Sequence, residues 1–188
     1  DVKEILAANS VINQDVTINS VATLEYAESL ISTKTDAPTV IVNGNVVVTT
    51  GAATFDAAQL ARVNLVTGKM ATVLKDLTVS NTATPVVATI DFGALTFVDQ
   101  SVYLTGTTST PKLKTITSDL SVNAEGDLDY STLTSIGGDF EVNDAITSLN
   151  LAGVFIGGDL STTGSPSGNL NLPNATFVDI GSGGVTYI

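Results

Sequence analysis

Short stretches in which apolar and polar residues alternate recur along the chain. In residues 137–142 a Gly-Gly pair and an Asp precede the triplet Phe-Glu-Val, and residues 157–162 repeat this arrangement. Residues 117–122 carry it with Thr-Ser in place of Gly-Gly. Strict alternation over a few residues predicts a short strand with one buried face, and recurrence along the sequence predicts a repeat protein.

Weaker copies of this motif extend the repeat toward both ends of the chain. They begin at Asp15, Asn45, Asp76, Ser101 and Gly184, at intervals of 18 to 31 residues. Between the motifs lies a second element, an apolar residue followed by an acid or amide and mostly by another apolar residue. A third element, an apolar pair such as Leu133 with Ile136, precedes the next motif.

Each repeat is therefore expected to form two or three very short strands. A single repeat cannot bury its own apolar face. Stacking the repeats about 4.8 Å apart lets each strand pair with its counterparts above and below. The expected inner ladder consists of Val16, Val46, Leu77, Val102, Leu120, Phe140 and Leu160. We predict one all-β domain over residues 1–188, with an N-terminal cap at 1–10 that includes a short helix over 1–8, and about eight irregular coils over 11–188. Residues 57–62 could add one helical turn.

The last coil begins at Gly184 and stops in mid-strand at Ile188. An open coil end exposes unpaired strand edges. Two interpretations stay open: the array continues beyond this point, or the end docks on another subunit and gives head-to-tail assembly.

Residues 133–142, Leu-Thr-Ser-Ile-Gly-Gly-Asp-Phe-Glu-Val, and residues 146–151, Ile-Thr-Ser-Leu-Asn-Leu, resemble the phrases of the receptor L-domain family, which is related to leucine-rich repeats. Residues 169–178 continue the resemblance, which is strong over 113–184 and faint before. It implies a right-handed β-helix and an extracellular or cell-surface setting, with microbial surface proteins as the nearest analogues.

Composition excludes several functions. There are 7 Lys and Arg against 19 Asp and Glu, and this net charge of −12 argues against nucleic acid and anionic membrane surfaces as partners. No apolar run approaches the roughly 20 residues needed to cross a bilayer. The chain has no His and no Cys, which removes the common catalytic triads, His-ligated zinc and the His base. We therefore expect no enzyme activity and no cofactor other than Ca²⁺.

The acidic position that opens each motif is the first candidate site. As a cation site it would use stacked carboxylates, because Ca²⁺ prefers several oxygen ligands, and the Ca²⁺ candidates are Asp119, Asp139 and Asp159. The favoured interpretation is structural: each side chain accepts hydrogen bonds from backbone N–H groups at its own corner. This structural corner ladder comprises Asp15, Asn45, Asp76, Asp119, Asp139 and Asp159.

The acid or amide of the second element forms the next candidate row, which comprises Glu25, Asp56, Asp91, Asp129, Asn150 and Asn171. Paired carboxylates could cleave a glycosidic bond. Such sites on β-helices usually add Lys or Arg, and we expect none to join this row. The basic residues are Arg62, Lys3, Lys34, Lys69, Lys75, Lys112 and Lys114.

The outward position of the strand that follows each acid forms a further row, which comprises Thr17, Val47, Thr78, Tyr103, Ser121, Glu141, Ser161 and Thr186. A regular Thr face could bind ice, but Val47, Tyr103 and Glu141 interrupt it. A glycan or protein partner is the better prediction for this face. The polar loops 80–84, 105–110 and 162–168 could extend a contact surface.

The sequence thus predicts a non-enzymatic extracellular or cell-surface module for adhesion or head-to-tail assembly. Its expected partners are other subunits, including copies of itself through the coil ends, or a cell-surface glycan or protein. The alternative is a β-helix that binds or cleaves carbohydrate, and ice binding is the third hypothesis.

Overall fold

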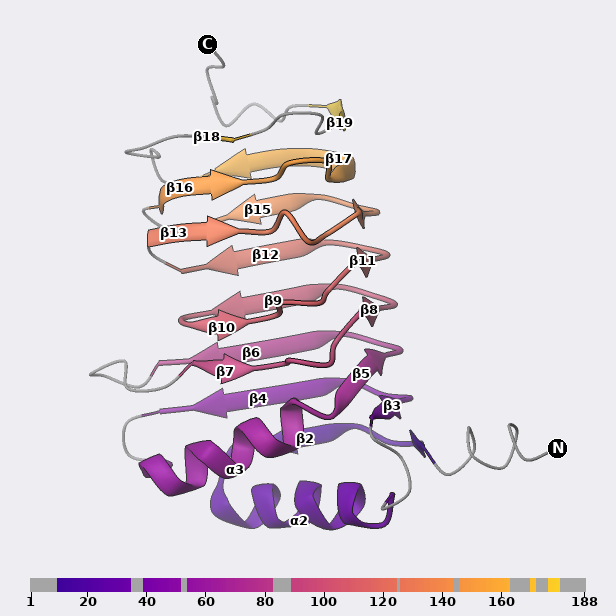
Figure 1. Cartoon of the computed structure of the whole chain (residues 1–188), viewed down its shortest axis with the longest axis vertical. Helices are drawn as coiled ribbons and strands as arrows, with labels where there is room; N and C mark the ends of the chain where they lie inside the picture. Colours follow the sequence, from indigo (N-terminus) through magenta and orange to yellow (C-terminus); the bar gives the residue numbers. More distant parts are fainter. Residues whose placement is uncertain are drawn as a thin grey trace, which may run out of the picture.

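The computed structural model of the chain describes residues 10–34, 39–51, 54–82, 89–124, 126–143, 146–162, 170–171 and 176–179. The main elements are short strands that stack in parallel along one axis (Figure 1). Fourteen of the strands form one large parallel sheet, and smaller sheets flank it. The expectation of a β-rich fold is confirmed.

The large sheet contains two rows of strands that we call the first and second faces. The first face comprises β1 (Val11–Ile12), β3 (Val40–Val42), β5 (Met70–Val73), β8 (Phe97–Val98), β11 (Thr115–Ile116), β14 (Ser135–Ile136), β17 (Phe155–Thr162) and β19 (Thr176–Asp179). The second face comprises β2 (Val16–Ile18), β4 (Val46–Thr50), β6 (Leu77–Asn81), β9 (Val102–Thr105), β12 (Leu120–Asn123) and β15 (Phe140–Val142). β17 is long enough to pair with both β14 and β15, so it joins the two faces.

Shorter strands form a third side. They are β7 (Ile90–Asp91), β10 (Thr108–Ser109), β13 (Gly126–Asp129), β16 (Ile146–Asn150) and β18 (Leu170–Asn171). The chain visits the first face, the second face and the third side in turn, and we call each such circuit a repeat. Each strand of the two faces pairs in parallel with its counterpart in the neighbouring repeat.

The predicted inner ladder of the second face is confirmed. Val16 pairs in direct register with Val46, and the register continues through Leu77, Val102, Leu120, Phe140 and Leu160. All seven side chains are buried. Because alternate side chains of a strand point to opposite faces, a slip by one residue would expose the whole ladder, so burial fixes the register.

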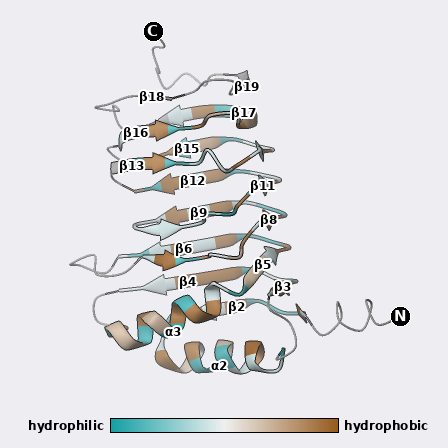
Figure 2. Cartoon of the chain, viewed as in Figure 1, coloured by the Kyte–Doolittle hydropathy of each residue, from teal (hydrophilic) through white to brown (hydrophobic). Residues whose placement is uncertain are grey.

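The first face supplies a matching inner row, which comprises Ile12, Val42, Val73, Val98, Ile116, Ile136 and Ile156. These side chains are also buried, and burying each one contributes roughly 1.5–3 kcal/mol. Hydrophobic segments run through the strands of successive repeats (Figure 2). The core is therefore one column of β-branched and Leu side chains shared by all repeats.

Two helices replace the third-side strand in the first two repeats, where the sequence analysis predicted no more than one helical turn over residues 57–62. The segment around Glu25 was interpreted as a strand, but it lies in α2 (Val21–Ser32), which buries Leu24, Ala27 and Ile31. These three residues are spaced by three and four, which is the helical period. Ser20 begins the helix with a capping box in which Ser20 and Thr23 exchange hydrogen bonds.

The second helix, α3 (Ala57–Thr67), begins where one helical turn was expected but continues well beyond it. Asp56 and Gln59 form its capping box, and Leu60, Val63 and Val66 are buried. The segment around Asp56 is thus a helix start, and its interpretation as a strand element was wrong. α2 packs on β2 and on α3 at the N-terminal end of the stack (Figure 1).

The helix expected over residues 1–8 lies outside the described residues, as does the final motif at Gly184. Among the described residues, none of the helices is long and apolar enough to span a bilayer.

Candidate functional site

The acidic position of each motif lies at the corner between the first and second faces. The structure brings the predicted residues together, with Ser101 among them, into one corner ladder of seven: Asp15, Asn45, Asp76, Ser101, Asp119, Asp139 and Asp159. A side-chain oxygen of each of the first six members accepts a hydrogen bond from the backbone N–H of the next member. The donor therefore comes from the neighbouring repeat, whereas we had expected an N–H at the residue's own corner.

The lengths of these hydrogen bonds follow the charge of the acceptor. Carboxylate acceptors give N···O distances of 2.7 Å at Asp15, 2.9 Å at Asp76, 2.9 Å at Asp119 and 2.8 Å at Asp139. The neutral acceptors give 3.3 Å at Asn45 and 3.4 Å at Ser101. Ionised acceptors make shorter and stronger hydrogen bonds. Accordingly, the backbone N–H of Asn45, then the Asn45 side-chain amide and the charge of Lys75 hold the pKa of Asp15 below its usual range.

The Gly-Gly pairs make room for this corner ladder. A Cβ on Gly138 would overlap Asp119 Oδ1, and a Cβ on Gly158 would overlap Asp139 Oδ1. A Cβ on Gly137 would overlap the backbone carbonyl of Thr117. The glycines are therefore needed for close approach between repeats, and the two described glycines with positive φ are others, Gly106 and Gly153.

The same geometry bears on the Ca²⁺ candidates Asp119, Asp139 and Asp159. The Oδ1 atoms of Asp119 and Asp139 each accept a backbone N–H, so these oxygens already have partners. Within the described ranges, no three acidic residues come close enough to hold a metal ion together. Ca²⁺ binding by these residues stays a prediction.

In the second predicted row, only the C-terminal members lie in register with one another. Asp129, Asn150 and Asn171 lie in direct register on β13, β16 and β18. Asp91 instead pairs with Ser109, while Glu25 and Asp56 belong to the helices. The expected continuous row is therefore wrong, because helices occupy the third side of the first two repeats.

Asp129 is the best-defined acid of this row. Its Oδ1 accepts the backbone N–H of Ser131 at 2.9 Å and the side-chain amide of Asn150 at 3.0 Å. Hydrogen bonds from the Ser131 side chain and backbone, followed by the Asn150 amide, lower the pKa of Asp129 against the opposing effect of partial burial.

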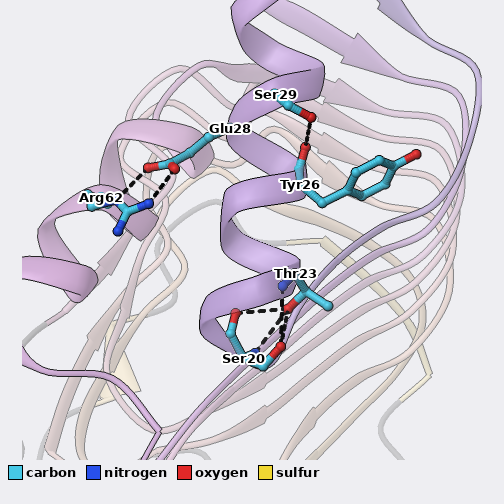
Figure 3. A network of polar contacts seen from close by, with 6 residues as sticks. All are labelled: Ser20, Thr23, Tyr26, Glu28, Ser29 and Arg62. Atoms are coloured by element: carbon cyan, nitrogen blue, oxygen red, sulfur yellow. Dashed lines mark hydrogen bonds and ion pairs between the residues drawn. The ribbon is translucent and has the colours of Figure 1, made fainter.

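Arg62 was expected to stand apart from the acids, but the helices bring it to them. Its Nε and Nη2 atoms donate to the two carboxylate oxygens of Glu28 at 2.7 and 2.6 Å (Figure 3). This bidentate pair joins α2 to α3, lowers the pKa of Glu28 and raises that of Arg62. Glu25 and Asp56 also raise the pKa of Arg62 through their charge. Because Arg62 on α3 binds both carboxylate oxygens of Glu28 on α2, the pair is a structural link between the two helices.

The outward row of the second face is in register from Thr17 to Ser161, as predicted. Tyr103 is exposed and the other described members are half-buried by their neighbours. Thr186 lies outside the described residues. The row is mixed in size and charge, with Glu141 beside Ser121 and Tyr103 beside Thr78.

A cleft opens on the third side, where the stacking is interrupted. β10 pairs with β7, and β13 pairs with β16, but β10 and β13 do not pair with each other. The space between them is a cleft of about 370 Å³. It is lined by Thr108, Ser109, Thr110, Pro111, Asp127, Leu128, Asp129, Tyr130 and Thr132.

One residue of the cleft lining carries an unsatisfied hydroxyl group. Thr108 Oγ1 is shielded from solvent and, within the described part of the chain, has no hydrogen-bond partner. Leaving a buried hydroxyl unpaired costs about 1–3 kcal/mol, so such a group needs an explanation. Tyr130, whose ring stands edge-on to Phe140 at 5.7 Å, forms an apolar wall, and burial raises its pKa.

Sequence reasoning found these residues only in part. Loop 105–110 was named for its polarity, and Asp129 for its place in a row, but nothing predicted that they face one another. The available signal was the 18-residue interval between Ser101 and Asp119, the shortest in the chain. The repeat that begins there gives β10 two residues, whereas β13 in the next repeat has four.

Comparisons with known proteins give this chain no relatives. No family model matches it, no curated protein matches it, and no solved structure matches it. The functional assignment therefore depends on the geometry of the chain itself.

Proposed function

We propose that this chain is a single-domain, right-handed β-solenoid that serves as a non-enzymatic extracellular or cell-surface module for adhesion or assembly. The observation that carries the proposal is the corner ladder together with the inner ladder. The hydrogen bonds of the corner ladder and one shared apolar core hold seven repeats in register. Such a column presents long, stiff lateral faces, which suits extended contact with a partner.

The chemistry of the chain supports a binding role over a catalytic one. The sequence supplies no His and no Cys, and its one Arg is bound to Glu28. The resemblance of residues 133–151 to receptor L-domain phrases favours a surface setting. A net charge of −12 keeps such a module soluble and makes its contacts sensitive to salt.

The helices change how assembly would occur. α2 packs on β2, the end strand of the second face, so a partner at this end would meet the helix as well as the edge of β1. Contacts at this end would use the helix surfaces, where Tyr26 and Leu65 are 55% and 70% exposed. Head-to-tail assembly would therefore have to accommodate α2, whereas lateral adhesion would not.

Light scattering of the full chain, with Ca²⁺ and with a chelator, measures assembly. Retention on layers of immobilised polysaccharide, immobilised protein or the chain itself measures adhesion. Growth into larger species, or retention on any layer that high salt weakens, supports the proposal. A chain that stays monomeric under all conditions and is retained on no layer overturns it.

A further inference from the structure

We infer that the cleft between β10 and β13 binds a neutral saccharide unit. The inference deepens the proposed adhesion role, on which it rests, by naming the ligand class and the site. It starts from an interruption in the fold. On the first and second faces, neighbouring repeats are hydrogen-bonded without a break, whereas on the third side β10 and β13 stand apart.

The size of the cleft suits a small polar ligand. Its volume of about 370 Å³ falls in the range of roughly 300–1,000 Å³ that is usual for small-molecule sites. The opening is bounded by two strand edges, so the ligand would lie between repeats and would be held from both sides.

The lining offers the donors and acceptors that sugar hydroxyls need. Thr108, Ser109, Thr110 and Thr132 supply hydroxyl groups, which both donate and accept. Asp127 and Asp129 supply carboxylates that accept from O–H donors. A carboxylate has about four acceptor sites, so the bond from Ser148 to Asp127 and the bonds from Ser131 and Asn150 to Asp129 leave room for a ligand hydroxyl.

Apolar side chains complete the lining. Pro111, Leu128 and Tyr130 provide a surface for the C–H faces of a pyranose ring. An apolar wall with a few convergent polar groups is the usual composition of a ligand site. The wall is rigid, because Tyr130 packs edge-on against the buried ring of Phe140.

The unsatisfied hydroxyl of Thr108 is the feature that a structural role does not explain. Its Oγ1 is buried at the cleft without a partner among the described residues. A sugar hydroxyl that reached this group would pair a hydroxyl that has no partner in the described part of the free chain. The site would thus gain free energy on binding that a fully satisfied surface cannot gain.

The charge of the cleft lining favours neutral over acidic sugars. The ionisable side chains of the lining are the carboxylates of Asp127 and Asp129, and the lining contains no Lys or Arg. Uronic and sialic acids would be repelled, because their carboxylates would lie beside these two without a cation between them. Neutral hexoses and N-acetylhexosamines meet no such repulsion.

Calorimetric titration of the full chain tests the inference with cello-, manno- and chito-hexaose, and with an oligogalacturonate as the acidic probe. We expect at least one neutral hexasaccharide to bind and the oligogalacturonate not to bind. Thr108→Val should weaken binding roughly ten-fold through the lost hydrogen bond. Its melting temperature should stay the same or rise, because an unpaired hydroxyl is replaced by a methyl group of equal size. Asp129→Asn should also weaken binding, and the Asn side chains at positions 150 and 171 show that this row accepts the amide.

The matched control is Thr115→Val, on β11 of the first face, which should bind like the wild type. The inference is overturned if no neutral saccharide binds, if Thr108→Val and Asp129→Asn bind normally, or if Ca²⁺ alone displaces the cleft's NMR signals while no saccharide does. Adhesion that persists on protein layers after such a result would show that the proposed function stands without this ligand.

Discussion

The N-terminal and C-terminal repeats share two faces but differ on the third side. The first two repeats, at intervals of 30 and 31 residues, place α2 and α3 there, whereas the last described repeats, at intervals of 20, place β13, β16 and β18. The two faces are almost unchanged between the regions. The difference shows that strand pairing on the two faces determines how the repeats stack. The third side can be either a helix or a strand, provided that it buries apolar side chains.

The two regions also hold their repeats together by different means. The C-terminal corners use Gly-Gly pairs that let backbone and carboxylate come close. The N-terminal corners use one glycine at most: Gly44, whose Cβ would overlap the Gln14 backbone, precedes Asn45, whereas Lys75 and Gln100 precede Asp76 and Ser101. The N-terminal region instead adds helix caps and the Glu28–Arg62 pair. Four changes separate these contributions, beginning with the largest expected effect.

Phe140→Ala should be the most damaging. Phe140 is fully buried between Leu120 and Leu160 and contacts Tyr130, so its removal leaves a cavity and should cost about 3–5 kcal/mol of the free energy of unfolding. Urea unfolding followed by circular dichroism measures this, and the helical signal of the N-terminal repeats should outlast the loss. Glu141→Ala, one residue further and outward, is the control and should change little. Equal losses for both variants would contradict the assigned strand register.

Gly137→Ala should come next. A Cβ at Gly137 would overlap the backbone carbonyl of Thr117, which cannot move without breaking the stack, and overpacking of this kind costs about 1–3 kcal/mol. Gly51→Ala in the N-terminal region is the matched change, because the nearest heavy atom to its Cβ, Thr54 Oγ1, lies at 3.5 Å. Thermal unfolding compares them. A larger effect at Gly51 would refute the close-approach role of the Gly-Gly pairs.

Ser20→Ala should have an intermediate effect that is confined to the N-terminal region. The Ser20 hydroxyl accepts the N–H of Thr23 at 3.2 Å, and the loss of such a cap costs about 1 kcal/mol. Hydrogen exchange should show faster opening of α2 with little change in β12 and β15. Ser29→Ala, which removes an exposed hydroxyl within the same helix, is the control. Uniform loss of protection across all repeats would mean that the helix is not a separable cap.

Glu28→Gln should have the smallest effect, about 0.5 kcal/mol, because both partners are about a third exposed and water screens the pair. The pKa of Glu28 is lowered in the folded chain, so its contribution is present above the ordinary value of 4.5 and is lost as the pH falls through the lowered folded value. The free energy of unfolding should therefore be larger for the wild type than for Glu28→Gln at neutral pH, and this difference should disappear in acid. An advantage that grows in acid would contradict the lowered pKa.

Part of the fold could be predicted because a strand has a period of two. The inner ladder from Val16 to Leu160 needed only the alternation of apolar and polar residues and one recurring acid to set the register. The outward row from Thr17 to Ser161 followed from the same alternation. The helix α2 was missed because Leu24, Glu25 and Tyr26 also fit an alternating strand. The helical spacing becomes visible only when Ala27 and Ile31 are included.

The candidate site was less accessible to sequence reasoning. Asp129 and loop 105–110 were noted, yet their proximity depends on β10 failing to pair with β13, and pairing between repeats is a property of the stack. The donors of the corner ladder were also assigned to the wrong repeat. A sequence shows which residue can accept a hydrogen bond, but not which of two nearby N–H groups the stacking will bring to it.

By itself, the sequence determined the inward and outward residues of the paired faces, the acidic charge and the absence of His and Cys chemistry, because these depend only on side-chain type and local period. The tertiary structure alone decided the inter-repeat donors of the corner ladder, the Glu28–Arg62 pair and the cleft at Thr108. Each of these joins residues from different repeats. Their distances are set by how the repeats stack, which depends on the packing of the whole column.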